Sequence, residues 1–180
     1  MASIFGHGIL AFTLSKALNH SNLKGLTILA ILSSILPDID VLAFCFNIPY
    51  EHMFGHRGFT HSIVFAVLWS SLLTFIFSKT YRLSFFIVLF LSTLSHGILD
   101  AMTTGGEGIG FLIPFNDDRY FFPFRVIKVS PIGIENFFSE WGIQVILSEI
   151  KFILLPCTLL LMVIFITKRI TKNSNKSTHI

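Results

Sequence analysis

Long apolar runs with charge confined to their ends constrain the fold of this chain more than any other feature. The mean hydropathy is +0.75 and 13% of the residues are charged, about half the share found in a soluble domain. A soluble fold of 180 residues could not bury so much apolar surface. We therefore expect an all-α integral membrane protein whose helical bundle forms one domain over residues 1–168.

Five apolar segments predict helices in the membrane, which gives four to five spans. They cover residues 3–18, 26–46, 62–78, 83–99 and 152–167. The first is short and contains Gly6 and Gly8, so whether it crosses the bilayer fully stays open. The net charge of +3 is too small and too dispersed to indicate nucleic acid binding.

Two segments lie outside these spans. Residues 103–149, between the last two spans, combine a glycine cluster (Gly105 to Gly110) with an aromatic stretch (Tyr120 to Phe124). This segment is too apolar for a solvated linker, so we expect a lid that rests on the bundle mouth or at the lipid interface. Residues 169–180 are a polar tail that we expect to be disordered and cytoplasmic.

Basic residues gather on one side of the threaded spans and set the expected orientation. That side carries Lys16, Lys24, Lys79, Arg82, Lys168, Arg169, Lys172 and Lys176. All 10 acidic residues fall on the other side. Because Lys and Arg near span ends favour the cytoplasm, the acidic side and the 103–149 segment are expected to be extracytoplasmic.

Four short polar clusters lie at the ends of the apolar runs. They are His7, Asp38 with Asp40, His56 to Ser62, and His96 with Asp100. An aspartate at the centre of a membrane helix costs roughly 2.5–3.5 kcal/mol, so three unpaired ones would cost about 8–10 kcal/mol. Such residues persist when they pair, line a wet cavity or hold an ion. Histidines beside three carboxylates form a set of metal ligands.

Two of these clusters offer paired ligands. His96 and Asp100, spaced i and i+4, project from one helix face and suit a single ion. The alternative is that Asp100 caps a loop and His96 bonds within the bundle. Asp38 and Asp40 reach one site together only in turned or extended backbone. One is expected to bind metal while the other orients a histidine or acts as a base, and capping around Pro37 is the alternative.

The third cluster contains both histidines and an arginine. His56 and His61 lie about 140° apart on a helix, so a loop is expected between them. His61 is the better ligand, while His56 and Arg57 are better placed to contact substrate. An arginine beside a metal is a natural partner for phosphate oxygens, although an ion pair of Arg57 with a neighbouring acid such as Glu51 is equally open. His7 joins the ligand set because it lies at the same end of the bundle.

The ordered motifs resemble a known family. They are Pro37-Asp38-Ile39-Asp40, His56-Arg57-Gly58-Phe59-Thr60-His61-Ser62, and His96-x-x-x-Asp100 followed by Thr103-Thr104-Gly105. Over residues 1–115 the chain resembles the LexA-regulated, membrane-bound metal-dependent hydrolases (YdjM type). That family is distantly similar to zinc-dependent phospholipase C and P1 nuclease.

The resemblance implies a cofactor, a site and a location. Asp40, His61, His96 and Asp100 would hold one Zn²⁺, with Asp100 bridging to a second ion near His7. One to two zinc ions are expected, with Mn²⁺ as an alternative, and the location would be the bacterial inner membrane. This chain departs from many members at Val41, where they carry a histidine, and it has no histidine between Asp100 and the tail.

Metal-assisted hydrolysis is the function we predict from these residues. Asp38 would act as the base, while His56 and Arg57 would face the substrate. A phosphoester of a lipid or lipid-linked substrate is favoured, and an ester or amide bond is also open because the same water attacks carbonyls. Two alternatives remain: a transporter or channel for protons or metal ions, and a membrane protein with a purely structural metal.

Overall fold

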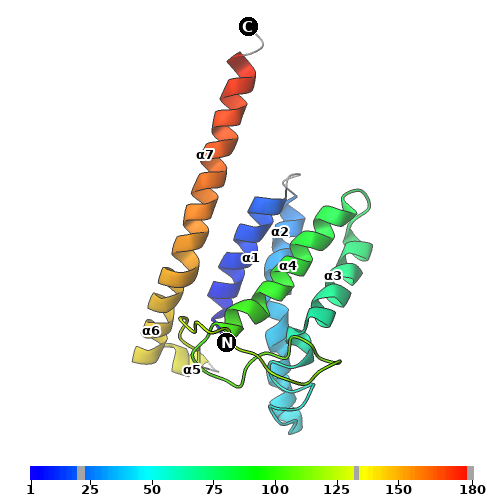
Figure 1. Ribbon diagram of the computed structural model, residues 1–180, viewed down its shortest axis with the longest axis vertical. Coiled ribbons are helices and arrows are strands. Elements are labelled where there is room, and N and C mark those ends of the chain that lie inside the picture. Colours follow the sequence, from blue (N-terminus) through cyan, green and yellow to red (C-terminus); the bar gives the residue numbers. More distant parts are fainter. Residues whose placement is uncertain (20–22, 132–133, 178–180) are drawn as a thin grey trace.

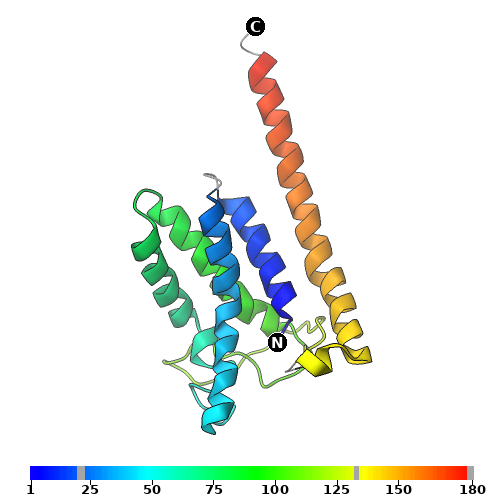
Figure 2. The ribbon, with the colours of Figure 1, turned by 180° about the vertical axis from the view of Figure 1, so that it is seen from behind.

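The computed structural model describes residues 1–19, 23–131 and 134–177, and this part of the chain folds into helices. Its only β pairings are two isolated bridges, Thr103 with Ile127 and Ile109 with Tyr120. Helices α1 (Ile4–Leu18), α2 (Lys24–Ile35), α3 (Ile63–Phe77) and α4 (Arg82–Ala101) form a bundle (Figures 1 and 2). The all-α class is confirmed.

Long apolar helices occur where the sequence predicts spans. Within the described residues, three are long and apolar enough to cross a bilayer: Lys24–Phe46, Arg82–Ala101 and Glu140–Thr171. The two shorter apolar helices are α1 and α3. Many large apolar side chains of α3 and the last helix are exposed, as expected for surfaces in contact with lipid. The helical membrane bundle is therefore confirmed.

The second long helix changes type at Pro37. Helix α2 ends at Ile35, and a 3₁₀-helix, η1 (Leu36–Phe46), continues from it. Proline lacks the amide hydrogen that an α-helix needs, so the regular ladder cannot pass through this position. A 3₁₀ segment has about three residues per turn, so residues two apart lie about 120° apart, compared with about 160° in an α-helix. Asp38 and Asp40 can therefore each bring a carboxylate oxygen to one group with His56.

The last helix is longer than predicted at both ends. Short α5 (Ile134–Phe137) precedes α6 (Glu140–Glu149), the π-helical turn η3 (Ile150–Leu154) and α7 (Leu155–Ser177), and the last three are continuous. Residues 140–149 of the expected lid are thus helical. The prediction of a disordered tail is wrong through Ser177, because Lys, Arg and Thr extend an existing helix at little cost. Residues 178–180 lie outside the described part.

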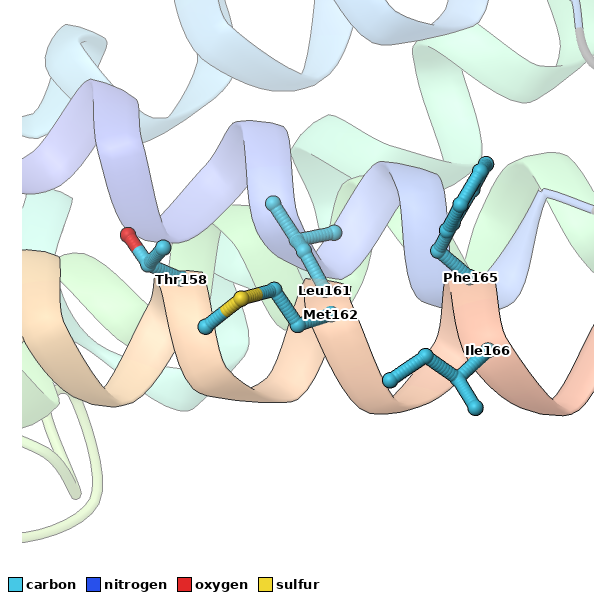
Figure 3. A pocket seen from close by; sticks show the side chains of 5 residues that line it. All are labelled: Thr158, Leu161, Met162, Phe165 and Ile166. Carbon is cyan, nitrogen blue, oxygen red and sulfur yellow. The ribbon is translucent and has the colours of Figure 1, made fainter.

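Helix α7 diverges from the bundle above its base (Figure 1). An apolar crevice of about 430 Å³ lies along it. Its lining residues are Thr158, Leu161, Met162, Phe165 and Ile166, and Figure 3 shows them beside the ribbon of α1. This lining is compatible with the hydrocarbon of a bilayer.

Two apolar clusters hold the helices together. One joins α2, α3 and α4 through Leu26, Ala30, Leu73, Phe85, Val88 and Leu89. The other joins the start of the chain, the end of α4 and the last helix through Ala2, Leu99, Ile127, Ile153 and Cys157. Polar bonds between helices add to this packing, such as Ser15 to Thr27 at 2.9 Å.

The connecting segment, residues 102–131, covers one end of the bundle, which we call the site end (Figure 1). Its backbone bonds to the end of α4, where the Phe122 amide donates to the Ala101 carbonyl at 3.0 Å. It also bonds to the start of α3, where the Ile63 amide donates to the Phe111 carbonyl at 3.0 Å. The end of α1, the start of α2, the α3–α4 connection and the end of α7 lie at the opposite end (Figures 1 and 2).

Candidate metal centre

Four of the sequence-predicted residues meet at the site end. Asp38 comes from η1, His61 from η2 (Phe59–His61), and His96 and Asp100 from the last turns of α4. One potential ligand atom from each lies within 4.8 Å of the others. We call this group the four-residue cluster. The i, i+4 spacing of His96 and Asp100 places both on one helix face, as predicted.

The distances within the four-residue cluster match a tetrahedron. The Nε2 atoms of His61 and His96 are 3.0 Å apart, and Asp38 Oδ1 lies 3.3 Å from His96 Nε2 and 3.8 Å from His61 Nε2. Asp100 Oδ2 lies 3.8 Å from His61 Nε2 and 3.9 Å from His96 Nε2. Ligand atoms about 2.0–2.1 Å from Zn²⁺ would be about 3.3–3.4 Å from one another. The cluster needs only small adjustments to reach that geometry.

The two histidines present their lone pairs to the same point. His96 donates its Nδ1 hydrogen to the Ser34 carbonyl at 2.7 Å. His61 Nδ1 lies 3.1 Å from Asp40 Oδ2, and burial lowers the pKa of the His61 imidazole, which favours its neutral form. With each hydrogen on Nδ1, two Nε2 lone pairs face each other, an arrangement that a shared cation would stabilise.

Unpartnered carboxylate oxygens provide the test of fit for such a cation. Neither oxygen of Asp38 accepts a hydrogen bond from the described residues, and Asp100 Oδ2 accepts none either. All three atoms are buried. Carboxylate oxygens without hydrogen-bond donors are unfavourable in a buried site, so a metal ion is the partner that this donor set fits. Two nitrogen and two oxygen ligands suit Zn²⁺, and Mn²⁺ is also compatible.

Asp40 lies beside the four-residue cluster, and both of its carboxylate oxygens accept hydrogen bonds. Its Oδ1 accepts from His56 Nδ1 at 2.7 Å, and its Oδ2 accepts from the Arg57 amide at 2.9 Å and the Thr60 hydroxyl at 2.7 Å. Asp40 therefore holds His56 and His61 in place. It also forms a second possible ligand group with Asp38 and His56.

Arg57 is buried and turned toward the cluster. Its backbone is left-handed (φ 64°) and its side chain is 1% exposed. Its Nε lies 3.4 Å from Asp100 Oδ2, and its other nitrogens donate to the Gly105 carbonyl and the Thr103 hydroxyl at 2.9 and 3.2 Å. Of the two roles open from the sequence, the geometry shows an ion pair, with Asp100 as the acid.

His7 is also part of the centre, on the side of α1. It is fully buried and its ring stacks on His96 with centroids 3.8 Å apart. Its Nε2 lies 3.4 Å from Asp100 Oδ1, and neither ring nitrogen has a hydrogen-bond partner among the described residues. It lies outside the four-residue cluster.

Several partners of the site were not anticipated from the sequence. The Ser34 carbonyl accepts from His96, and the Thr103 hydroxyl accepts from Arg57. The Ala2 amide donates to Asp100 Oδ1 at 2.6 Å. Glu149 is buried at the base of the last helix. Glu149 belongs to the 103–149 segment that was expected outside the membrane, so hydropathy gave no signal for its burial. The backbone partners depend on tertiary contacts that no spacing reveals.

Comparisons with known proteins identify the family of this chain. The sequence profile of the YdjM inner membrane protein family matches residues 1–173. The chain is also 45% identical over 134 residues to the inner membrane protein YbcI of Escherichia coli (strain K12), which covers 73% of this chain and 78% of that protein. No solved structure matches. The chain is an inner membrane protein and belongs to the YdjM inner membrane protein family.

Proposed function

We propose that this protein is a membrane-bound metal-dependent hydrolase that cleaves a phosphoester of a lipid or lipid-linked substrate. The observation that carries the proposal is the four-residue cluster, whose distances suit one Zn²⁺. Both Asp38 oxygens and Asp100 Oδ2 in this cluster accept no hydrogen bond from the described residues. Zn²⁺ bound there would polarise a phosphoryl oxygen and lower the pKa of a water molecule toward neutrality.

His56 is the residue best placed to move a proton. Its Nδ1 is held by Asp40 at 2.7 Å, which leaves Nε2 as the exchanging atom. This pairing of a carboxylate with a histidine fixes the orientation of the ring and its tautomer. We therefore assign proton transfer to His56, metal binding to Asp38, and the orientation of His56 and His61 to Asp40.

Arg57 and the exposed basic residues support a phosphate-bearing substrate. The guanidinium of Arg57 is 3.4 Å from Asp100 and offsets negative charge at the cluster. Arg125 on the connecting segment is exposed and lies 4.7 Å above the Phe121 ring. Arginine at a membrane surface pairs readily with phosphate oxygens. A substrate in the bilayer would bring its headgroup to this end, and we propose from the distribution of charge that this end is extracytoplasmic.

A structural metal is the second candidate, and a specific observation favours it. The cluster supplies four protein ligands. Asp38 is the most exposed of them, with its side chain 10% exposed, and even its carboxylate oxygens are buried. Structural zinc sites have four protein ligands, whereas catalytic sites keep one position for water. Hydrolysis at this centre would require a fifth ligand or the release of Asp38.

The test combines metal analysis with turnover. Purified protein in proteoliposomes should contain about one Zn²⁺ per chain and hydrolyse a phospholipid or lipid-linked phosphate in a chelator-sensitive reaction. His96→Ala should lose both properties, whereas His52→Ala, at an exposed histidine of the same end, should keep both. Metal without turnover on phosphoesters and acyl esters would support the structural alternative. Equal metal content in both variants would refute the centre.

A further inference from the structure

Glu149 is a buried carboxylate at the base of the last helix, immediately before the π-helical turn η3. It is 6% exposed, although it lies within a candidate membrane span. A buried acid in such a segment is costly unless it has partners. Its partners in the described part of the chain are at the start of α1, about 145 residues away in sequence, since both bonds go to Ser3.

Ser3 binds Glu149 through two groups. The Ser3 amide donates to Glu149 Oε1 and the Ser3 hydroxyl donates to Oε2, each at 2.5 Å. Ser3 is also the N-cap of α1, where its Oγ accepts from the Gly6 amide at 3.3 Å. The carboxylate thus lies at the positive end of the α1 dipole. These bonds hold the start of α1 against the last helix.

The residue before Ser3 contacts the metal centre. The Ala2 amide donates to Asp100 Oδ1 at 2.6 Å, and both residues are fully buried. This bond occupies Oδ1. Oδ2 accepts no hydrogen bond from the described residues and lies near His61 and His96, with Arg57 Nε at 3.4 Å. The Ala2 amide therefore determines which oxygen of Asp100 is free for a metal ion.

Close packing keeps this connection rigid. A Cβ on Gly6 would lie 2.9 Å from Ile153 Cδ1 and 3.2 Å from the Glu149 carboxyl group. A side chain at this position would therefore push the Ile153 side chain and the Glu149 carboxyl group out of their places. Ala2 and Ile153 belong to the same apolar cluster. A displacement of the last helix would consequently be passed on to Ala2 and Asp100.

We propose that Glu149 is a positioning residue for the metal centre: through Ser3 and Ala2 it orients Asp100, so that the docking of the last helix sets metal affinity. This inference rests on the proposed function, because it assumes that Asp100 binds the metal. Hydrogen-bond partners of metal-ligating side chains typically change metal affinity by about 10–100-fold when they are mutated. An effect of that size is expected here, even though Glu149 touches no atom of the four-residue cluster.

The experiment measures zinc affinity by competition with a chromophoric chelator, using the full chain in detergent. Glu149→Ala should weaken zinc binding about 10–100-fold and alter the visible spectrum of the Co²⁺-substituted protein. Glu149→Gln, which can still accept from the Ser3 amide, should recover most of the affinity. Ser3→Ala should give an intermediate loss. The control is Glu140→Ala, at an exposed acid of the same helix.

The outcomes separate this inference from the proposed function. If wild-type protein binds zinc and Glu149→Ala and Ser3→Ala keep wild-type affinity and the wild-type Co²⁺ spectrum, the inference is overturned and Glu149 serves only to cap α1. If wild-type protein binds no zinc, the proposed function fails and the inference fails with it. Should Glu149→Ala not fold, Glu149→Gln and Ser3→Ala still decide the question by the same affinity measurement.

Discussion

Asp38 and Asp40 differ by two positions, yet the structure gives them opposite surroundings, and replacement by asparagine should separate them. Both Asp38 oxygens lack hydrogen-bond partners in the described part of the chain and lie beside the histidine Nε2 atoms. Asp40 accepts from His56, from the Arg57 amide and from Thr60. We expect Asp38→Asn to weaken zinc binding by more than 100-fold, since it replaces a ligand. Asp40→Asn should weaken it by about 10–100-fold, the effect of losing a partner of a ligand.

The stability of the metal-free protein should change in opposite directions. Asp38→Asn removes a buried charge that has no donor, so unfolding should become harder by about 1–2 kcal/mol. Asp40→Asn places an amide group against existing donors and should lose at least one bond to a charged group, about 1.5–3 kcal/mol. Zinc affinity is measured by chelator competition and stability by denaturant unfolding with excess chelator. The reasoning is refuted if Asp40→Asn abolishes zinc binding while Asp38→Asn retains it.

Three further predictions concern packing, the site arginine and orientation. Gly6→Ala should lower the free energy of unfolding by about 1–3 kcal/mol, because the new Cβ would press on side chains of the last helix. The control Gly25→Ala, with no atom within 4 Å of the new Cβ, should be neutral or slightly stabilising. Equal effects of the two variants in denaturant unfolding would contradict this packing. Arg57→Lys should reduce zinc affinity and activity together, because an ammonium group cannot contact Asp100, the Gly105 carbonyl and the Thr103 hydroxyl at the same time. Wild-type zinc affinity and activity in this variant would show that these guanidinium contacts are dispensable. In intact cells an impermeant thiol reagent should label Asn116→Cys and spare Thr80→Cys; the reverse pattern would show that the orientation is inverted.

The helical bundle could be predicted because it depends on local composition. Runs of apolar residues specify membrane helices wherever they occur, and the observed helices lie where those runs lie. The sequence did not predict where the last helix begins and ends. Polar residues after Thr167 continue a helix that is already formed, and residues 140–149 mix polar and apolar side chains. Hydropathy alone detects neither extension.

The sequence predicted which residues form the candidate site better than it predicted the role of each residue. His61, His96 and Asp100 meet as expected, because residues at the ends of neighbouring spans share one end of the bundle. The resemblance assigned the fourth ligand to Asp40, whereas the geometry brings Asp38 into the four-residue cluster. The difference arises from tertiary contacts. Asp40 accepts hydrogen bonds from His56, the Arg57 amide and Thr60. Asp38 instead faces the Nε2 atoms of His61 and His96.

The sequence alone thus determined the membrane location, the helical class and the residue types available for a metal, since these follow from hydropathy and from the cost of charge in a bilayer. Tertiary structure alone decided which oxygens remain free and which donors occupy the others. Those assignments depend on contacts between distant parts of the chain, such as Ala2 with Asp100 and Ser3 with Glu149. Such contacts form only when the helices pack. Every residue except proline carries the same backbone amide, so the sequence does not indicate which amide will donate to which carboxylate.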